Sequence, residues 1–298
     1  KIKLKKIIVL FKDFPVWFKK YADNLDIRKK IQFEENYYKT PSLHLVFKSA
    51  ELLKNFKEKH ISSSSRSAFL TETKNIELIS NYKKGDWWVQ DFSSMLPLHL
   101  IPDLKNKNII DLCSAPGGKA FQAISQGGKV TLNDKNKKRI IVLKENLKRL
   151  NFKNHIINKD ILNLSIKKKY DFIILDAPCS AIGTIRRNPE IFYKNRTPDI
   201  DTLIILQRKL LQKASLLVNK KGGLLYMVCS FFYEETLEQM EYFLSKNKNF
   251  RILKFDKIEK NAGMNTFIDT KGYILIPPTT YKSFFIDGFF SVTFVKND

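Results

Sequence analysis

The fold of this chain is decided by the stretch Asp111-Leu112-Cys113-Ser114-Ala115-Pro116-Gly117-Gly118-Lys119. An apolar run that includes residues 109 and 110 leads into it, and a helix-compatible run over residues 120–125 follows it. Proline cannot lie inside a central strand, so the strand must end before Pro116. The two glycines allow a sharp turn that a ligand can approach closely. The stretch therefore predicts a strand, a tight turn and a helix whose first N–H groups face a ligand.

Composition limits the class of protein. The chain has 298 residues, of which 43% are hydrophobic, and this length suits two domains or one large one. It contains no run of about 18 apolar residues, so we expect no membrane span. The formal net charge of +23 suggests a polyanionic partner such as nucleic acid. Since 44 of the 53 basic residues are Lys, a biased genome explains the charge equally well.

Cysteine and histidine usage limits the compartment and the metal content. The three cysteines form no C-x-x-C pair, so a disulfide framework is not expected and a reducing cytoplasm fits. The four histidines show no metal-ligand spacing, and we therefore expect no metal site.

Residues 1–85 are expected to form a small α/β domain. They hold 19 basic and 9 acidic residues, a net charge of +10, against +13 for the much longer remainder. Such a basic surface would bind RNA or simply be solvated. The elements that we expect are helices within residues 12–40, a strand at 42–47, a helix at 50–59, a loop at 62–65 and one or two strands within 68–79.

Strands and helices alternate over residues 86–298. Repeated βα units predict an open, doubly wound, mostly parallel sheet. We expect Asp91 to cap a helix that runs through Leu98. The predicted strands lie at residues 108–112, 129–132, 155–157, 170–175 and 222–228, followed by an antiparallel pair at 273–276 and 289–295. Long helices are predicted at 201–218 and 231–244.

Polar or reactive residues follow five of these strands in succession. Ligands of such sheets bind outside the carboxyl ends of the strands, so five polar strand ends indicate a site. The residues at these ends are Cys113 with the glycine turn, Asp134, Asp160, Asp176 with Cys179, and Cys229.

Asp134 follows the glycine turn by about 20 residues, a spacing at which a carboxylate can accept both hydroxyls of a ribose. The chain lacks a G-x-G-x-x-G motif there, which disfavours a dinucleotide and a dinucleotide-dependent oxidoreductase. A ligand with a ribose and no pyrophosphate fits better, and S-adenosylmethionine is such a ligand. Taken alone, Asp134 has a helix cap as its alternative, which we weigh below the ribose role.

Two further stretches carry reactive groups. Residues 176–190 bring a carboxylate, a thiol and the pair Arg186-Arg187, which could grip phosphates or belong to an ordinary basic loop. Residues 227–230 include Cys229, and Glu234-Glu235 follow shortly after. An isolated Cys is often only a small buried hydrophobe, but here all three cysteines lie at predicted strand ends.

At these three stretches the sequence resembles the RNA 5-methylcytosine methyltransferases of the Sun/Nop2 type. The resemblance extends from about Phe14 to Lys296. Its motifs are Trp17, residues 89–91, 113–119 and 176–190, Cys229-Ser230 and residues 287–290. It implies a Rossmann-like class I S-adenosylmethionine-dependent methyltransferase fold. Members often carry an upstream helical RNA-binding domain, and since the chain starts at Lys1 rather than Met, we expect an upstream part to be missing.

The resemblance also implies roles for individual residues. Cys229 would be the nucleophile that attacks C6 of cytosine, which lets C5 accept a methyl group. Cys179 would assist proton removal or release of the adduct, and Asp176 would face the N3 side of the base. A thiol attacks as a thiolate, so we expect the site to favour that form, with a nearby cation as one means. The cofactor S-adenosylmethionine would be held by Cys113, Ser114, Ala115, Pro116, Gly117, Gly118, Lys119, Asp134, Asp160 and Asp176.

The substrate implied by the resemblance is RNA, with small-subunit 16S rRNA expected first, on an unpaired or flipped base. The alternatives are a transfer RNA cytosine-5 methyltransferase, or a non-catalytic RNA-binding ribosome assembly factor. A DNA cytosine-5 methyltransferase would use Cys179, in its Pro-Cys pair, as the nucleophile and would not need Cys229. We expect a monomer.

Overall fold

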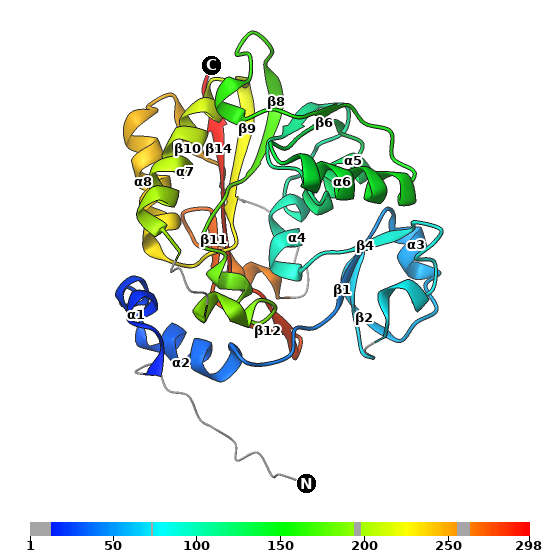
Figure 1. Ribbon diagram of the computed structural model, residues 1–298. Helices are drawn as coiled ribbons and strands as arrows, with labels where there is room; N and C mark the ends of the chain where they lie inside the picture. Colours follow the sequence, from blue (N-terminus) through cyan, green and yellow to red (C-terminus); the bar gives the residue numbers. More distant parts are fainter. Residues whose placement is uncertain (1–12, 73, 194–197, 255–262) are drawn as a thin grey trace.

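The computed structural model describes residues 13–72, 74–193, 198–254 and 263–298 (Figure 1). Its α-helices are α1 Val16–Ala22, α2 Ile27–Asn36, α3 Ala50–Lys54, α4 Phe92–His99, α5 Gly118–Ser125, α6 Lys137–Arg149, α7 Ile200–Ser215 and α8 Leu237–Lys246. Its strands are β1 His44–Phe47, β2 His60–Ser64, β3 Ser67–Leu70, β4 Trp87–Val89, β5 Asn108–Asp111, β6 Lys129–Asn133, β7 Ile156–Ile157, β8 Tyr170–Asp176, β9 Val218–Val228, β10 Phe250–Ile252, β11 Tyr273–Ile276, β12 Thr279–Tyr281, β13 Phe284–Ile286 and β14 Phe289–Lys296. In this described part of the chain, no helix is both long enough and apolar enough to span a membrane.

An eight-stranded sheet organises the molecule, in the order β10-β14-β9-β8-β5-β6-β7 with β11 paired to β14. Strands β5 to β9 pair in parallel, whereas β10, β11 and β14 are antiparallel to their neighbours. The predicted doubly wound, mostly parallel sheet is confirmed. Strand order runs one way from β5 to β7 and the other way from β8 to β9, so a topological switch point lies between β5 and β8, where such sheets bind ligands.

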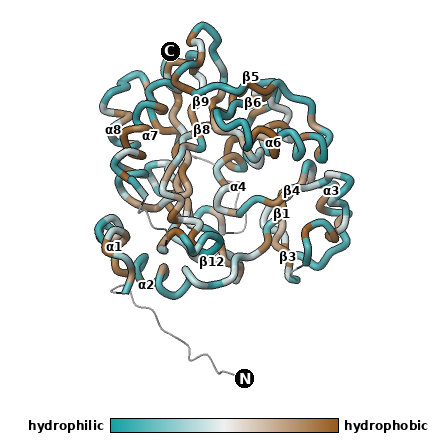
Figure 2. The backbone as a smooth tube through the Cα atoms, in the orientation of Figure 1, coloured by the Kyte–Doolittle hydropathy of each residue, from teal (hydrophilic) through white to brown (hydrophobic). Residues whose placement is uncertain are grey.

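Both faces of this sheet are covered, which explains why its strands are nearly continuous apolar runs. Helices α4, α5 and α6 lie on one side and α7 and α8 on the other (Figure 1). A hydrophobic core lies on each face of the sheet, and successive strand residues alternate between the two cores. Ile109 and Met227 pack in the core beneath α4, α5 and α6, whereas Ile110 and Val228 pack in the core beneath α7 and α8. Figure 2 accordingly shows the central strands as mostly hydrophobic and the outer loops as mostly hydrophilic.

A second, four-stranded antiparallel sheet has the order β2-β3-β1-β4. It lies beside the large sheet, next to α4 (Figure 1). Its last strand, β4, begins at Trp87, so the small sheet continues past residue 85, and the division of the chain at that residue stays a prediction.

Helices α1 and α2 pack on the large sheet's loops rather than on the small sheet. Phe18 is fully buried, and its ring centroid lies 5.1 Å from that of Phe192 and 5.7 Å from that of Phe232. Tyr21 donates a hydrogen bond from its hydroxyl to Asp201 over 3.2 Å. Since Phe232 lies three residues after Cys229, these helices brace the loop that follows β9.

Three local expectations were wrong, and a fourth, the strands within 68–79, was met only by β3. Residues 62–65 were expected as a loop, but Ser62 to Ser64 belong to β2, where Ser63 is held by hydrogen bonds to His44 and Ser67. The helix expected at 50–59 ends at Lys54, and the strands expected within 68–79 give way after Leu70 to a 3₁₀ turn, η2 Ile76–Leu78. The helix expected from residue 231 begins only at Leu237, after a 3₁₀ turn, η6 Tyr233–Glu235.

Truncation of Phe18 tests this bracing. Phe18→Ala should lower the free energy of unfolding by about 3 kcal/mol, because it empties the centre of an aromatic cluster. Val16→Ala, on the same helix at an 80% exposed position, is the control and should change stability by less than about 0.5 kcal/mol. Urea unfolding followed by tryptophan fluorescence measures both. Equal losses in the two variants would contradict the packing described.

Candidate active site

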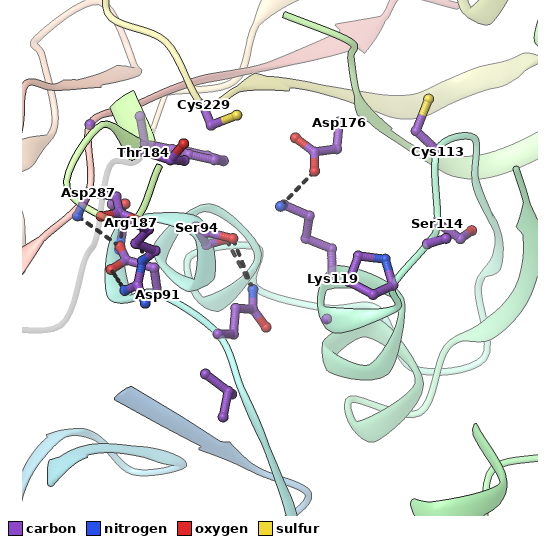
Figure 3. A pocket seen from close by; sticks show the side chains of 18 residues that line it. Asp91, Ser94, Cys113, Ser114, Lys119, Asp176, Thr184, Arg187, Cys229 and Asp287 are labelled. Atoms are coloured by element: carbon purple, nitrogen blue, oxygen red, sulfur yellow. Dashed lines mark hydrogen bonds and ion pairs between the residues drawn. The ribbon is translucent and has the colours of Figure 1, made fainter. Parts of the chain in front are cut away.

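A cleft of about 330 Å³ opens at the switch point, a size suited to a small-molecule ligand. Its walls come from six places in the sequence: the segment between β4 and α4, the glycine turn before α5, the end of β8, the loop that follows β8, the residue after β9, and the start of β14. Figure 3 shows how these side chains converge. The lining residues include Gln90, Asp91, Ser94, Cys113, Ser114, Ala115, Pro116, Gly118, Lys119, Asp176, Thr184, Arg187, Cys229, Asp287 and Phe289.

The glycine turn forms one wall of the cleft, and its sharp bend requires glycine at position 117. Gly117 has φ of 124° and is the N-cap residue of α5, and a Cβ atom on it would lie 1.9 Å from the Phe121 ring. Lacking a side chain, Gly117 cannot cap the helix, so the first N–H groups of α5 keep their capacity to bind a ligand. The predicted strand, turn and helix are thus all found.

An ion pair spans the switch point. Lys119 Nζ, on α5, lies 2.7 Å from Asp176 Oδ2, at the end of β8, as Figure 3 shows. Burial alone would lower the pKa of Lys119, but the Asp176 carboxylate and its hydrogen bond outweigh burial and the pKa is raised. The Cys229 sulfur adds to this rise, so Lys119 is held as a cation at the switch point.

Cys179 and Cys229 lie side by side. Residues at the five strand ends were expected to form one site, and these two residues do meet. Their sulfur atoms lie 3.3 Å apart. The hydrogen bond to Cys229, then burial, raises the pKa of Cys179, so Cys179 is held as a neutral thiol; either sulfur can donate in this contact. Cys179 does not itself line the cleft, whereas Cys229 does.

Cys113 lies apart from Cys229, on the other side of Asp176 in Figure 3. Burial and the nearby Asp111 carboxylate raise the pKa of Cys113 well above its ordinary value. Its backbone N–H donates to Asp111 over 3.2 Å. Cys113 is therefore a neutral thiol in the wall of the cleft and is not suited to act as a nucleophile.

Asp134 and Asp160 lie at the carboxyl ends of β6 and β7, outside the residues that line the cleft. Asp134 is buried, and its two oxygens accept from Ala115 N at 3.2 Å and Asn136 N at 2.8 Å. Asp160 accepts from Leu162 N over 2.9 Å at the start of a 3₁₀ turn. Asn136, rather than Asp134, caps α6. Nowhere in the part of the chain that the structure describes do three His, Cys, Asp or Glu side chains gather as a metal site would require.

The two arginines do not form the phosphate grip that was considered. The Arg186 side chain is fully buried beside Asp287, at 3.8 Å. Arg187 lies 2.9 Å from Asp91 and 2.7 Å from Asp287, and these carboxylates offset its charge. The sequence indicated Asp91 as a helix cap, which it is, through Ser93 N at 2.9 Å. Nothing in the sequence indicated that Asp91 and Asp287 share Arg187, because the three residues are far apart along the chain.

The fold and the cleft define a Rossmann-like methyltransferase architecture, and comparisons with known proteins give the family. Residues 98–294 match the model of the 16S rRNA methyltransferase RsmB/F family, and the chain belongs to this family. It is 34% identical over 226 residues to ribosomal RNA small subunit methyltransferase B of Photorhabdus laumondii, covering 74% of this chain and 49% of that protein. A probable ribosomal RNA small subunit methyltransferase B of Synechocystis is 28% identical over 76% of this chain and 51% of that one. The chain thus spans about half the length of the curated relatives it matches.

Two solved structures share the fold. NSun6 from Pyrococcus horikoshii, crystallised with SFG, has a TM-score of 0.77 at 16% identity, over 96% of this chain and 99% of that one. A methyltransferase homologue from the same organism has a TM-score of 0.73 at 22% identity, over 95% of each chain. Both matches extend across the small sheet as well as the large one.

The buried carboxyl of Asp111 makes stability depend on pH. Burial, followed by the Asp176 charge, raises the pKa of Asp111 to about 7, above the value of about 3.9 in an unfolded chain. The contribution of protonated Asp111 to the free energy of unfolding is therefore complete below about pH 4. It is lost as the pH rises to about 7, by about 1.4 kcal/mol per pH unit. Asp111→Asn should gain stability relative to the wild type over this range in thermal unfolding measured at several pH values. Asp103→Asn, at an exposed turn, should follow the wild type, and an Asp111→Asn profile parallel to the wild type would refute the assignment.

Proposed function

We propose that the protein transfers a methyl group from S-adenosylmethionine to C5 of a cytosine in RNA, with 16S rRNA as the target. Family membership supports the reaction class and the RNA. The observation that carries the chemistry is the pair of thiols 3.3 Å apart, beside the Lys119–Asp176 ion pair and the open glycine turn. The net charge of +23 is consistent with a polyanionic substrate.

The residues around the glycine turn fit S-adenosylmethionine. The uncapped start of α5 suits the carboxylate of its amino-acid part, and Gly118, the first residue of α5, lines the cleft there. Asp134 and Asp160, at the next two strand ends, would serve the ribose and the adenine side. When bound, the cofactor supplies an electrophilic methyl group on its sulfonium.

Cys229 is the nucleophile in this proposal. It follows the central strand β9, lines the cleft, lies 3.3 Å from the Cys179 sulfur and interacts electrostatically with Lys119. Its thiolate forms a bond to C6 of cytosine, and the electron pair of the C5=C6 bond becomes available at C5. Asp176, which also lines the cleft, would face N3 of the base and favour protonation there.

In this proposal Cys179 acts as the base after methyl transfer. The bond between Cys229 and C6 removes the thiolate that Cys179 had been donating to, and with it the main cause of the raised pKa of Cys179. Cys179 can then release its proton to water and, as a thiolate, accept the proton from C5. The C5=C6 bond reforms, the C6–S bond breaks, and its electron pair returns to Cys229.

Cofactor binding tests the first half of this proposal. Asp134→Ala should weaken binding of S-adenosylmethionine about 10- to 100-fold, since hydrogen bonds to a carboxylate contribute about 1.5–3 kcal/mol. Isothermal titration calorimetry on the full chain measures the dissociation constant. Asp103→Asn serves again as the control and should bind like the wild type. Unchanged affinity in a folded Asp134→Ala would remove Asp134 from the cofactor site.

A denaturing gel should distinguish the roles of the two thiols, because the two cysteine variants should differ in the covalent RNA adduct that they form. Unmodified 16S rRNA transcript and S-adenosylmethionine are incubated with each variant. Cys179→Ala should accumulate a covalent protein–RNA band because release is impaired, whereas Cys229→Ala should form no adduct and transfer no methyl group.

A transfer RNA transcript in parallel tests the choice of RNA. Methylation of the transfer RNA alone would move the substrate while leaving the chemistry in place. The reverse pattern of the two cysteine variants would make Cys179 the nucleophile. Absence of methylation of both RNAs by the wild type, with RNA binding retained, would favour a non-catalytic RNA-binding protein.

A further inference from the structure

A buried carboxylate lies behind the two thiols. Glu235, in η6, is fully buried, and all the groups that it binds are donors. Its Oε1 accepts from Ser180 N at 2.8 Å and from Gln207 Nε2 at 3.1 Å, and its Oε2 accepts from the Ser180 hydroxyl at 2.5 Å. No cation pairs with Glu235 within residues 13–72, 74–193, 198–254 and 263–298. A buried carboxylate is costly, so one held by neutral donors needs a reason.

These contacts bracket Cys179 on both sides. Ser180, the next residue, gives both its N–H and its hydroxyl to Glu235. Pro178, the preceding residue, accepts from Gln207 Nε2 over 2.9 Å. Gln207 and Glu235 bind each other, and the Tyr226 hydroxyl donates to Gln207 Oε1 at 3.2 Å and to the carbonyl of Glu235 at 2.9 Å. The loop that carries Cys179 is thus tied to α7, β9 and η6.

Cys229 is fixed by other means. It follows β9, whose last residue, Val228, pairs with Phe290, and its carbonyl accepts from Gly183 N at 3.0 Å. Glu235 makes no hydrogen bond to Cys229 or to its neighbour Ser230. Among the contacts of the described residues, a 3.4 Å contact between their hydroxyls is the one link between the serines that follow the two thiols. Loss of the carboxylate therefore acts first on Cys179.

We propose that Glu235 is a positioning residue that holds the Cys179 thiol against Cys229 through Ser180, and that it is needed for release of the RNA adduct more than for its formation. This inference rests on the proposed function. Glutamine at position 235 keeps the volume but turns one acceptor into a donor, which would face a donor of Ser180 or Gln207. The loop must then shift, and misplacement of a catalytic group by about 1 Å can cost about 100-fold in rate.

The test compares Glu235→Gln with Glu234→Gln on the full chain. Glu234 is the adjacent residue, and its hydrogen bond goes to Asn24 at 3.4 Å, away from the thiols. With 16S rRNA transcript and S-adenosylmethionine, Glu235→Gln should still form the Cys229 adduct but release it about 10- to 100-fold more slowly. The covalent band should therefore accumulate in a denaturing gel, as with Cys179→Ala. Glu234→Gln should behave as the wild type.

A purely structural role predicts a different pattern. The rates of adduct formation and adduct release would then fall together, the covalent band would not accumulate, and the unfolding temperature would be lowered. This result would overturn the proposal. Ser180→Ala, which removes one of the three bonds, gives a milder second test in the same direction should Glu235→Gln fail to fold. Cys179→Ala on the same gel distinguishes failure of the positioning role from failure of the proposed function. If it traps an adduct and neither Glu235→Gln nor Ser180→Ala does, the positioning role is wrong; if it traps none, the proposed function is wrong as well.

Discussion

The pairing of β8 with β9 is the constraint on which the candidate site depends. These parallel strands are adjacent at the centre of the sheet, and their register sets Asp176 opposite Met227. Cys179 lies three residues beyond the first of these and Cys229 two beyond the second, so both chains leave the sheet at the same level. A shift of one residue would turn each side chain to the opposite face. The 3.3 Å contact between the sulfur atoms is therefore a consequence of strand register.

Burial keeps this register in place. Met227 and Val228 pack in different cores on the two faces of the sheet, so a slipped strand would expose apolar surface on both sides. Packing of α1 around Phe18 extends this support to the loop after β9. The ion pair between Lys119 and Asp176 then joins β8 to α5 across the switch point. Cleft, carboxylate, cation and thiols are thus positioned by one sheet.

Sequence reasoning predicted the parts of the fold that depend on local patterns. Buried parallel strands are apolar runs, so β5 and β8 were found close to their true bounds, and the glycine turn was found because its backbone requirement limits the residue type. Strands made of polar residues were missed: Ser63, in β2, is buried only because His44 and Ser67 satisfy its hydroxyl. The helix expected from residue 231 was placed too early because Glu235 turns inward, which apolar periodicity cannot show.

The site was predicted in its elements but not in its connections. Residues at strand ends could be grouped because parallel strands share one edge. Which of these side chains contact one another could not be predicted, because strand order is set by contacts between residues far apart in sequence. Thus Arg187 was considered for phosphate binding, whereas it binds Asp91 and Asp287. Cys113 is likewise separated from Cys229 by Asp176 (Figure 3), although it lies at an equivalent strand end.

Direct identification of the attacking sulfur tests the central claim most sharply. RNA carrying 5-fluorocytidine would trap the adduct in the wild-type protein, because fluorine at C5 cannot leave as a proton does. After nuclease and protease digestion, mass spectrometry would show which cysteine carries the nucleotide. The account predicts the peptide that contains Cys229. Attachment at Cys179 or Cys113 would contradict the assignment of the nucleophile that the geometry of the cleft supports.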